Sequence, residues 1–216
     1  MGENNLILLL FVLMEYLCGS LMFSYWLGLA VKKDLKTIGD GNPGAFNLWN
    51  AAGYKLGLLG VLLDFMKGYL PLVFLYKAGF LCGYWLVPIA LAPIIGHVFP
   101  VFTRFKGGKA IAVTFGVWSA ITGFKISFLF AVILAMIQIM VSLLNKGKKV
   151  SSDEDGVLVV GGMIILGICL KVSGLPVYYI GIWFGNQIIF LYANRGKLYR
   201  FWKERNFLKI TGLLKH

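Results

Sequence analysis

Long apolar runs separated by short polar connections dominate the chain and predict membrane-spanning helices. A helix rises 1.5 Å per residue, so about 20 apolar residues cross a hydrocarbon core of about 30 Å. The seven runs are Asn5 to Val31, Lys55 to Tyr76, Phe80 to Phe99, Ala110 to Thr122, Ile126 to Leu144, Val157 to Leu170 and Leu175 to Ala193. The fourth and sixth are short, and we expect them to be tilted or shielded by neighbours. The pattern predicts an all-α membrane protein with seven transmembrane helices.

Composition agrees with this class. Hydrophobic residues make up 59% of the 216 positions, charged residues 14%, and mean hydropathy is +0.80. We therefore expect one integral-membrane domain over residues 1–216 and exclude an ordinary soluble fold. Cys18, Cys82 and Cys169 lie far apart in apolar runs, in no metal or redox spacing, which is typical of buried hydrophobic positions.

The net charge of +12 is spread unevenly along the chain. Basic residues gather in the first, third and fifth connections and after Asn194, whereas Lys77, Lys125 and Lys171 alone flank the opposite side. The positive-inside rule then puts the N-terminus outside and the C-terminus in the cytoplasm. The basic segment 194–216 also carries Phe201 and Trp202, which favours a short interfacial helix on anionic lipid rather than a nucleic-acid partner.

This topology directs every polar motif to the cytoplasmic face. The first connection holds GDGNPGAFN from Gly39 to Asn47, the third lies within Gly96 to Gly116, and the fifth holds SSDED from Ser151 to Asp155. Successive backbone N–H groups of a glycine-rich turn can form an anion-binding nest, although such a segment is often a simple turn. We expect the three connections to meet at one pocket.

The segment Gly96 to Gly116, GHVFPVFTRFKGGKAIAVTFG, is the first candidate for chemistry. His97, Arg104, Lys106 and Lys109 lie among glycines and a proline, which suits an anionic group such as phosphate. Its KGGK sequence does not fit a nucleotide-binding P-loop, because Thr103 stands where the first glycine would be. The alternative is a basic membrane-edge loop whose lysines contact lipid phosphates.

Asp64 and Lys67 stand three residues apart inside the second run, and so on one helical face. Ionisable groups at membrane depth are costly unless they are paired or functional. They form either an internal ion pair or part of the phosphate pocket. The sequence contains no metal-ligand cluster, so we expect no metal and no cofactor.

Taken together, these segments resemble the PlsY family, the acyl-phosphate-dependent glycerol-3-phosphate acyltransferases of bacteria. Gly19 and Ser20 are similar to the family's Gly-Ser pair, GDGNPGAFN to its GSGNPGATN, and Asp64 to Gly68 to its D-x-x-K-G. The segment from Gly96 is similar to GHxxPVFxxFKGGKGVATxxG, and the resemblance covers nearly the whole chain.

The resemblance implies a seven-span enzyme in a bacterial plasma membrane, with its active site on the cytoplasmic face. Its partners would be acyl phosphate, glycerol 3-phosphate or a similar polyol phosphate, and membrane lipid, without metal, nucleotide or protein nucleophile. Residues expected to contact reacting groups are Ser20, His97, Lys106 and Lys109. Residues expected to bind substrate or phosphate are Gly39, Gly41, Asn42, Gly44, Asn47, Asp64, Lys67, Gly107, Gly108, Ser152, Asn194 and Lys197.

Several polar positions depart from the family pattern. Asp40 stands where serine is usual, Asn50 where arginine is usual, and the C-terminal His-x-x-Asn becomes Asn194 and Lys197. These changes keep a second interpretation open, a catalytically silent or acceptor-altered paralogue that binds acyl phosphate or a polyol phosphate. A transporter or lipid-binding protein is a third, although no inverted repeat is visible.

Overall fold

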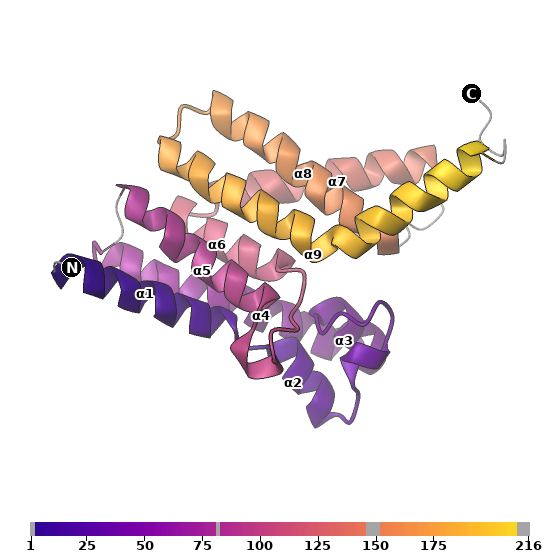
Figure 1. Ribbon diagram of the computed structural model, residues 1–216, viewed down its shortest axis with the longest axis horizontal. Coiled ribbons are helices and arrows are strands. Elements are labelled where there is room, and N and C mark those ends of the chain that lie inside the picture. The colour runs from indigo at the N-terminus through magenta and orange to yellow at the C-terminus, as the bar shows by residue number, and fades with distance from the viewer. Residues whose placement is uncertain (1–2, 81–82, 146–151, 211–216) are drawn as a thin grey trace.

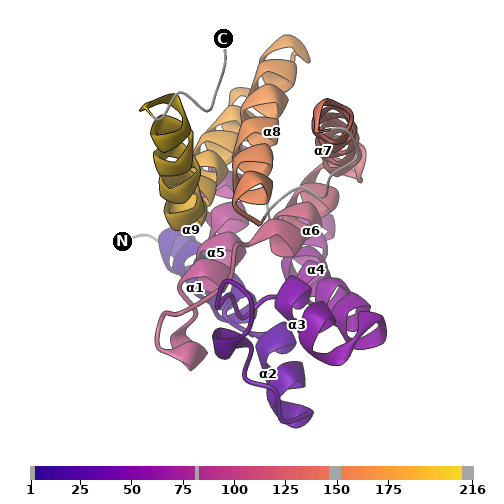
Figure 2. The same ribbon diagram turned by 90° about the vertical axis from the view of Figure 1, so that its right-hand side faces the viewer.

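The computed structural model describes residues 3–80, 83–145 and 152–210, and the regular structure there is helical. Side chains are described for residues 5–80, 83–145 and 154–203. The long helices lie side by side as a bundle, with the short helices α2 and α3 at one end (Figures 1 and 2). The elements are α1 Glu3–Gly19, α2 Phe23–Ala30, η1 Leu35–Thr37, α3 Ala45–Ala52, α4 Tyr54–Lys77, η2 Gly83–Trp85, α5 Leu86–Val98, η3 Val101–Thr103, α6 Ile111–Thr122, α7 Lys125–Leu144, α8 Ser152–Val172 and α9 Val177–Ile210.

Five helical stretches in this part of the chain are long and apolar enough to cross a membrane. They are Asn5–Ala30, Tyr54–Lys77, Gly83–Thr103, Lys125–Leu144 and Glu154–Val172. The other two predicted spans correspond to α6, which has only 12 residues, and to the first half of α9. The chain is therefore an all-helical, multi-pass integral membrane protein with fewer full-length candidates than the seven predicted.

The first predicted span corresponds to the candidate span Asn5–Ala30, but it consists of two helices, because α1 ends at Gly19 and α2 begins at Phe23. A break at membrane depth leaves carbonyl groups without intrahelical donors. Lys67 Nζ donates to Leu21 O, which lies between the two helices, at 2.5 Å. The break thus provides the buried Lys67 with a backbone acceptor, Leu21 O. The pattern of apolar residues alone could not predict this contact.

Close packing of α1 on α5 fixes this break beside the middle of the bundle. A Cβ atom on Gly19 would lie 2.2 Å from Pro93 O, and one on Gly96 would lie 2.2 Å from Tyr16 O. Both glycines are therefore needed because backbone touches backbone, as at many helix contacts in membranes. Tyr16 also donates its hydroxyl to Phe99 O at 2.7 Å.

The C-terminal part differs from its prediction in two ways. The predicted sixth span, Val157 to Leu170, is too short, since α8 begins at Ser152 and takes in most of the acidic SSDED sequence. Acidic residues in a first helical turn are favoured by the helix dipole. The segment after Asn194 is helical as predicted as far as Ile210, but it is the continuation of α9.

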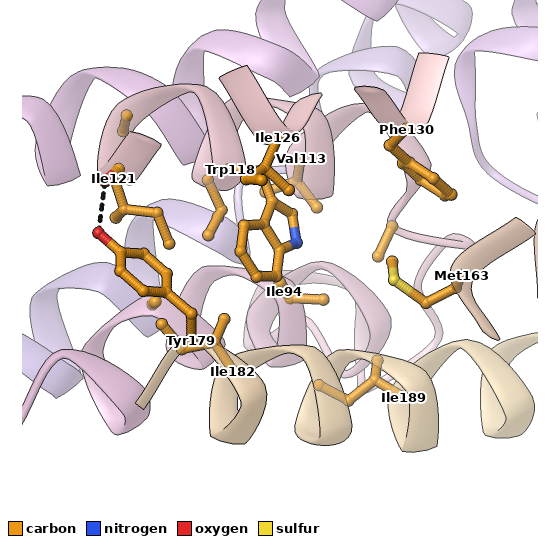
Figure 3. Packing of buried hydrophobic residues seen from close by; sticks show 14 of the residues in the cluster. Ile94, Val113, Trp118, Ile121, Ile126, Phe130, Met163, Tyr179, Ile182 and Ile189 are labelled. Carbon is orange, nitrogen blue, oxygen red and sulfur yellow. Dashed lines mark hydrogen bonds between the residues drawn. The ribbon is translucent and has the colours of Figure 1, made fainter. Parts of the chain in front are cut away.

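The apolar core lies between α5, α6 and the helices α7 to α9 that cover them, and Trp118 is fully buried within it. Figure 3 shows this side chain packed among Val113, Ile94 and Ile182. Tyr179 on α9 donates its hydroxyl to Ile121 O at 3.0 Å, which satisfies a carbonyl near the end of α6 (Figure 3). These contacts hold α9 against the helix that follows the KGGK sequence.

The polar connections collect at one end of the bundle. In Figure 1 the segment between α2 and α3 and the C-terminal half of α9 lie toward the right, and the segment after α5 lies near the middle of the view. The α4–α5 and α8–α9 connections lie at the opposite end. The fold therefore brings together the segments that the sequence singled out, although they are far apart along the chain.

Candidate active site

A pocket of about 330 Å³ lies where three segments meet at this end of the bundle. The segment before α3 provides one wall, the KGGK loop a second and α9 the third. Asp40 is the one acid among the lining residues, against four basic side chains. The lining residues are Asp40, Gly41, Asn42, Gly107, Gly108, Lys109, Ala193, Arg195, Gly196, Lys197 and Arg200.

Asn47 shapes the first wall. Its buried side-chain Nδ2 donates to Ile38 O at 2.7 Å, to Asn42 O at 2.9 Å and to Asp40 Oδ1 at 3.1 Å. Gly39 and Gly41 have φ values of +59° and +73°, a left-handed conformation that favours glycine. A Cβ on Gly39 would also lie 2.6 Å from Asn47 Oδ1. The sequence-predicted turn thus exists, and Asn47 is its internal brace.

The KGGK loop forms the second wall and lies directly on the end of α5. Gly108 N donates to His97 O at 3.0 Å, and Thr103 Oγ1 donates to Lys106 O at 2.9 Å. A Cβ on Gly107 would lie 2.0 Å from His97 O, and one on Gly108 would lie 2.3 Å from His97 Nε2. Both glycines allow the loop to approach His97. This contact fixes the position of the backbone from which the Lys109 side chain extends.

Asp40 joins the first wall to the other two. Its Oδ1 accepts a hydrogen bond from Asn42 N at 3.2 Å, while its Oδ2 is ion-paired with Lys109 and lies 3.3 Å from Lys197 Nζ. Lys197 comes from the middle of α9, so one carboxylate ties together three separate segments. A simple anion-binding turn would require the Asp40 carboxylate to point away from the pocket. It instead contacts two lysines that line the pocket.

The electrostatics of this cluster are strongly coupled. Burial raises the pKa of the Asp40 carboxyl, but the hydrogen bond from Lys109 and the charges of both lysines outweigh it and hold that pKa well below its usual range. Burial lowers the pKa of Lys109 to about 8, and the charge of Lys197 adds to this, whereas Asp40 opposes it. Lys109 therefore titrates much closer to neutral pH than an ordinary lysine.

A second polar cluster lies deeper, at the break between α1 and α2. Asp64 accepts a hydrogen bond from Ser24 Oγ at 2.7 Å and pairs with Lys67 Nζ at 2.9 Å. His97 Nδ1 lies 3.9 Å from Asp64 Oδ1, and all three ionisable side chains are buried. The structure thus contains the intrahelical pair, and neither Asp64 nor Lys67 lines the pocket described above.

Other predicted residues lie around the pocket rather than in its lining. Ser20 is fully buried and donates its hydroxyl to Tyr16 O at 2.8 Å, and the Lys106 side chain is exposed. Asn194 is buried and donates to Phe190 O at 3.0 Å. Ser152 begins α8, but its side chain lies outside the described residues. Gly44 precedes the first residue of α3 and lies beside Asn42.

Five lining residues were not predicted as site residues, namely Asp40, Ala193, Arg195, Gly196 and Arg200. Arg195 also stacks over the Tyr192 ring, with its Cζ 3.9 Å from the ring centroid. The signal was present in the sequence, because Ala193, Gly196, Lys197 and Arg200 follow the spacing of one helical face. Ending the last helix at Ala193 hid this pattern.

No group of three or more metal-ligating side chains occurs among the described residues. The cationic donors and open glycine backbone instead suit a phosphate group. Fold and pocket together define an integral membrane protein with a pocket of four basic side chains at one end of its helical bundle.

Comparisons with known proteins extend this conclusion. The family model for glycerol-3-phosphate acyltransferase matches residues 9–204. Glycerol-3-phosphate acyltransferase 1 of Thermotoga maritima is 34% identical over 196 residues, which cover 89% of this chain and 96% of that protein. The enzyme of Aquifex aeolicus is 39% identical over 114 residues, or 53% and 59% of the two chains.

Two solved structures are similar over nearly their whole length. Crystal structures of PlsY (YgiH), an integral membrane glycerol 3-phosphate acyltransferase, match in the glycerol 3-phosphate form with a TM-score of 0.79 and 28% identity, and in the lysophosphatidic acid form with 0.75 and 29%. Each match covers 92% of this chain and 93% of the other. The chain belongs to the PlsY-type glycerol-3-phosphate acyltransferase family. It is a membrane acyltransferase of phospholipid synthesis that produces lysophosphatidate.

Proposed function

We propose that this chain transfers a fatty acyl group from an acyl phosphate to the sn-1 hydroxyl of glycerol 3-phosphate and releases inorganic phosphate. The observation that carries the proposal is the pocket itself, in which the KGGK loop and α9 present four basic side chains opposite the Gly39–Asn47 turn. Donor and acceptor each carry a phosphate, so a site for this reaction must hold two anionic groups near each other. The related crystal structures with glycerol 3-phosphate and lysophosphatidic acid support this choice of acceptor and product.

The chemistry needs no covalent enzyme intermediate. The acceptor's hydroxyl oxygen attacks the carbonyl carbon of the acyl phosphate, and the bond from that carbon to the phosphate oxygen breaks. The leaving phosphate takes the electron pair, and the hydroxyl proton passes to a phosphate oxygen of the acceptor or of the leaving group. Lys109 stabilises the developing negative charge, while binding in one pocket aligns the two substrates.

His97 and Ser20 remain proposed site residues with different positions from that of Lys109. His97 supports the KGGK loop through its carbonyl and lies beneath Gly108. Ser20 lies at the end of α1, where Gly96 of α5 packs closely against it. We propose that both hold the loop and helix ends in place, with His97 the conventional candidate for accepting a proton.

The proposed membrane arrangement keeps seven spans, with the N-terminus outside, the C-terminus in the cytoplasm and the pocket facing the cytoplasm. The grouping of the motif-bearing segments at one end of the bundle supports it (Figure 1), as does the excess of basic residues in those segments. Single-cysteine labelling from either side of intact cells, in a variant lacking the three native cysteines, tests this orientation. Labelling of a Lys106→Cys variant only after membrane permeabilisation is the expected result.

The proposed reaction is tested directly with purified protein in lipid micelles. Acyl phosphate and glycerol 3-phosphate should together yield lysophosphatidate and one phosphate for each turnover, measured by mass spectrometry and phosphate release. Acyl-coenzyme A in place of acyl phosphate should give no product. Product formation from the coenzyme A ester alone would refute acyl phosphate as the donor. Binding without turnover of any polyol phosphate would instead favour the silent paralogue.

A further inference from the structure

Asp40 contacts two lysines in the pocket that a bound phosphate would also contact. Its Oδ2 is ion-paired with Lys109 and lies 3.3 Å from Lys197 Nζ, so both lysines share one anionic partner within the protein. The side chains of Lys197 and Asp40 are only 8% and 17% exposed, so water screens this cluster weakly. A phosphate that contacts both lysines therefore competes with the carboxylate.

We propose that Asp40 is an internal counter-ion of the substrate site, displaced from Lys109 and Lys197 when the phosphate of glycerol 3-phosphate binds. The inference rests on the proposed function. It adds to that function a residue that lowers the affinity for glycerol 3-phosphate, because its carboxylate competes with the substrate phosphate for the two lysines. Without the Asp40 carboxylate, Lys109 and Lys197 would lose the acid that contacts both of them, and Asp155 on α8, whose charge also acts on both lysines, would be left to offset them. Asp40 thus stabilises the lysine pair and weakens the binding of a phosphate to it.

The two carboxylate oxygens of Asp40 have separate tasks, which makes the proposal testable. Oδ1 accepts from Asn42 N at 3.2 Å and from Asn47 Nδ2 at 3.1 Å, and so shapes the turn. Oδ2 contacts only the lysines in the interactions given above. Asp40→Asn keeps an acceptor oxygen for the turn and removes the negative charge. Asp40→Ala removes both the acceptor oxygen and the negative charge. The difference between Asp40→Ala and Asp40→Asn therefore measures the effect of losing the turn's hydrogen bonds.

Binding and turnover are measured separately on the full-length protein in micelles, at pH 6.5 so that Lys109 stays protonated. Isothermal titration with glycerol 3-phosphate and with inorganic phosphate gives affinities that do not depend on catalysis. We expect Asp40→Asn to bind both anions about tenfold more tightly than the wild type and to show a similarly lower KM for glycerol 3-phosphate. The kcat should change less than KM. Unchanged or weaker binding by a folded Asp40→Asn protein overturns the proposal.

A matched control is Asp34→Asn, which removes an acidic charge from the same connection. Asp34 accepts a hydrogen bond from Lys36 N at 3.0 Å and does not line the pocket. Its replacement should leave phosphate affinity within about twofold of the wild type. An equal gain in both variants would show that net charge, rather than the Asp40 contact, sets the affinity, and would refute the inference.

A double-mutant cycle keeps the proposal testable if Asp40→Asn is poorly stable. In Lys197→Gln the carboxylate faces one lysine fewer, so adding Asp40→Asn should improve phosphate binding less than it does with Lys197 present. Additive effects contradict a shared ion cluster. Absence of wild-type turnover would refute the proposed reaction, yet the binding comparison would still decide the role of Asp40.

Discussion

Replacing Gly107 with alanine tests whether the contact between the KGGK loop and α5 positions the site. The new Cβ would lie 2.0 Å from His97 O and 2.6 Å from Val98 O, where ordinary contact begins near 3.4 Å. The loop or the end of α5 must then move by about 1.4 Å, the difference between 3.4 and 2.0 Å. Both clashing atoms belong to the backbone, so no side-chain rotation can relieve them.

A displacement of this size should strongly reduce the rate, because Lys109 follows Gly107 by only two residues. Misplacing a reacting group by about 1 Å can cost about 100-fold, and overpacking costs about 1–3 kcal/mol of stability. We expect Gly107→Ala to lose about 100-fold in kcat/KM while thermal unfolding in micelles still shows a folded protein. Phosphate release with acyl phosphate and glycerol 3-phosphate provides the measurement.

The matched control is Gly161→Ala on α8, where a Cβ would meet no atom within 4 Å. It should keep wild-type activity and gain up to about 1 kcal/mol of helix stability. The reasoning fails if Gly107→Ala retains activity within about threefold of the wild type. It also fails if the control loses as much activity as the test variant.

Three further predictions concern the charged residues. Lys109→Ala should lose about 100-fold in kcat/KM, since a charge-stabilising donor contributes about 3 kcal/mol. Lys106→Ala should lose less than about tenfold, because the Lys106 side chain is exposed. Equal losses for the two variants in steady-state assays would contradict the assigned geometry. Because Lys109 must be protonated to hold phosphate and its pKa is about 8, kcat/KM should fall as pH rises through about 8. Asp40→Asn should move this limb to lower pH, because Asp40 raises that pKa, and an unmoved limb would argue against control by Lys109. Lys67→Met should lower the free energy of unfolding by about 3–5 kcal/mol, because it leaves the Asp64 charge buried and unpaired. Adding Asp64→Asn should restore part of that loss in thermal unfolding, and no recovery would contradict the pairing.

Much of the membrane architecture followed from apolar run length, because lipid forces long helices to satisfy their own backbone groups. The run Asn5 to Val31 misled for the same reason, since a break at Ser20 leaves hydropathy unchanged. The break depends on Lys67, which donates to Leu21 O from another helix. A contact between residues so far apart in sequence leaves no local pattern.

The parts of the candidate site that could be predicted from the sequence are the glycine-rich turn and the loop that combines glycines with lysines. The turn before α3 and the KGGK loop carried such a signal, and the structure places them in one pocket. Arg200 was missed because the apolar criterion ended the last helix before its basic half. Asp40 was recognised as unusual, but its partners on the KGGK loop and α9 could come only from tertiary structure.

The two polar clusters are linked, and this explains why costly charges persist at membrane depth. Asp64 and Lys67 hold the break between α1 and α2, and His97 Nδ1 lies 3.9 Å from Asp64 Oδ1. The same His97 accepts the Gly108 N–H through its backbone oxygen and lies beneath that glycine. The deep cluster therefore supports the loop that presents Lys109, although it does not line the pocket. Substitutions at the ion pair should consequently reduce kcat and stability together, whereas Asp40→Asn, which keeps an acceptor oxygen for the turn, should act mainly on acceptor affinity.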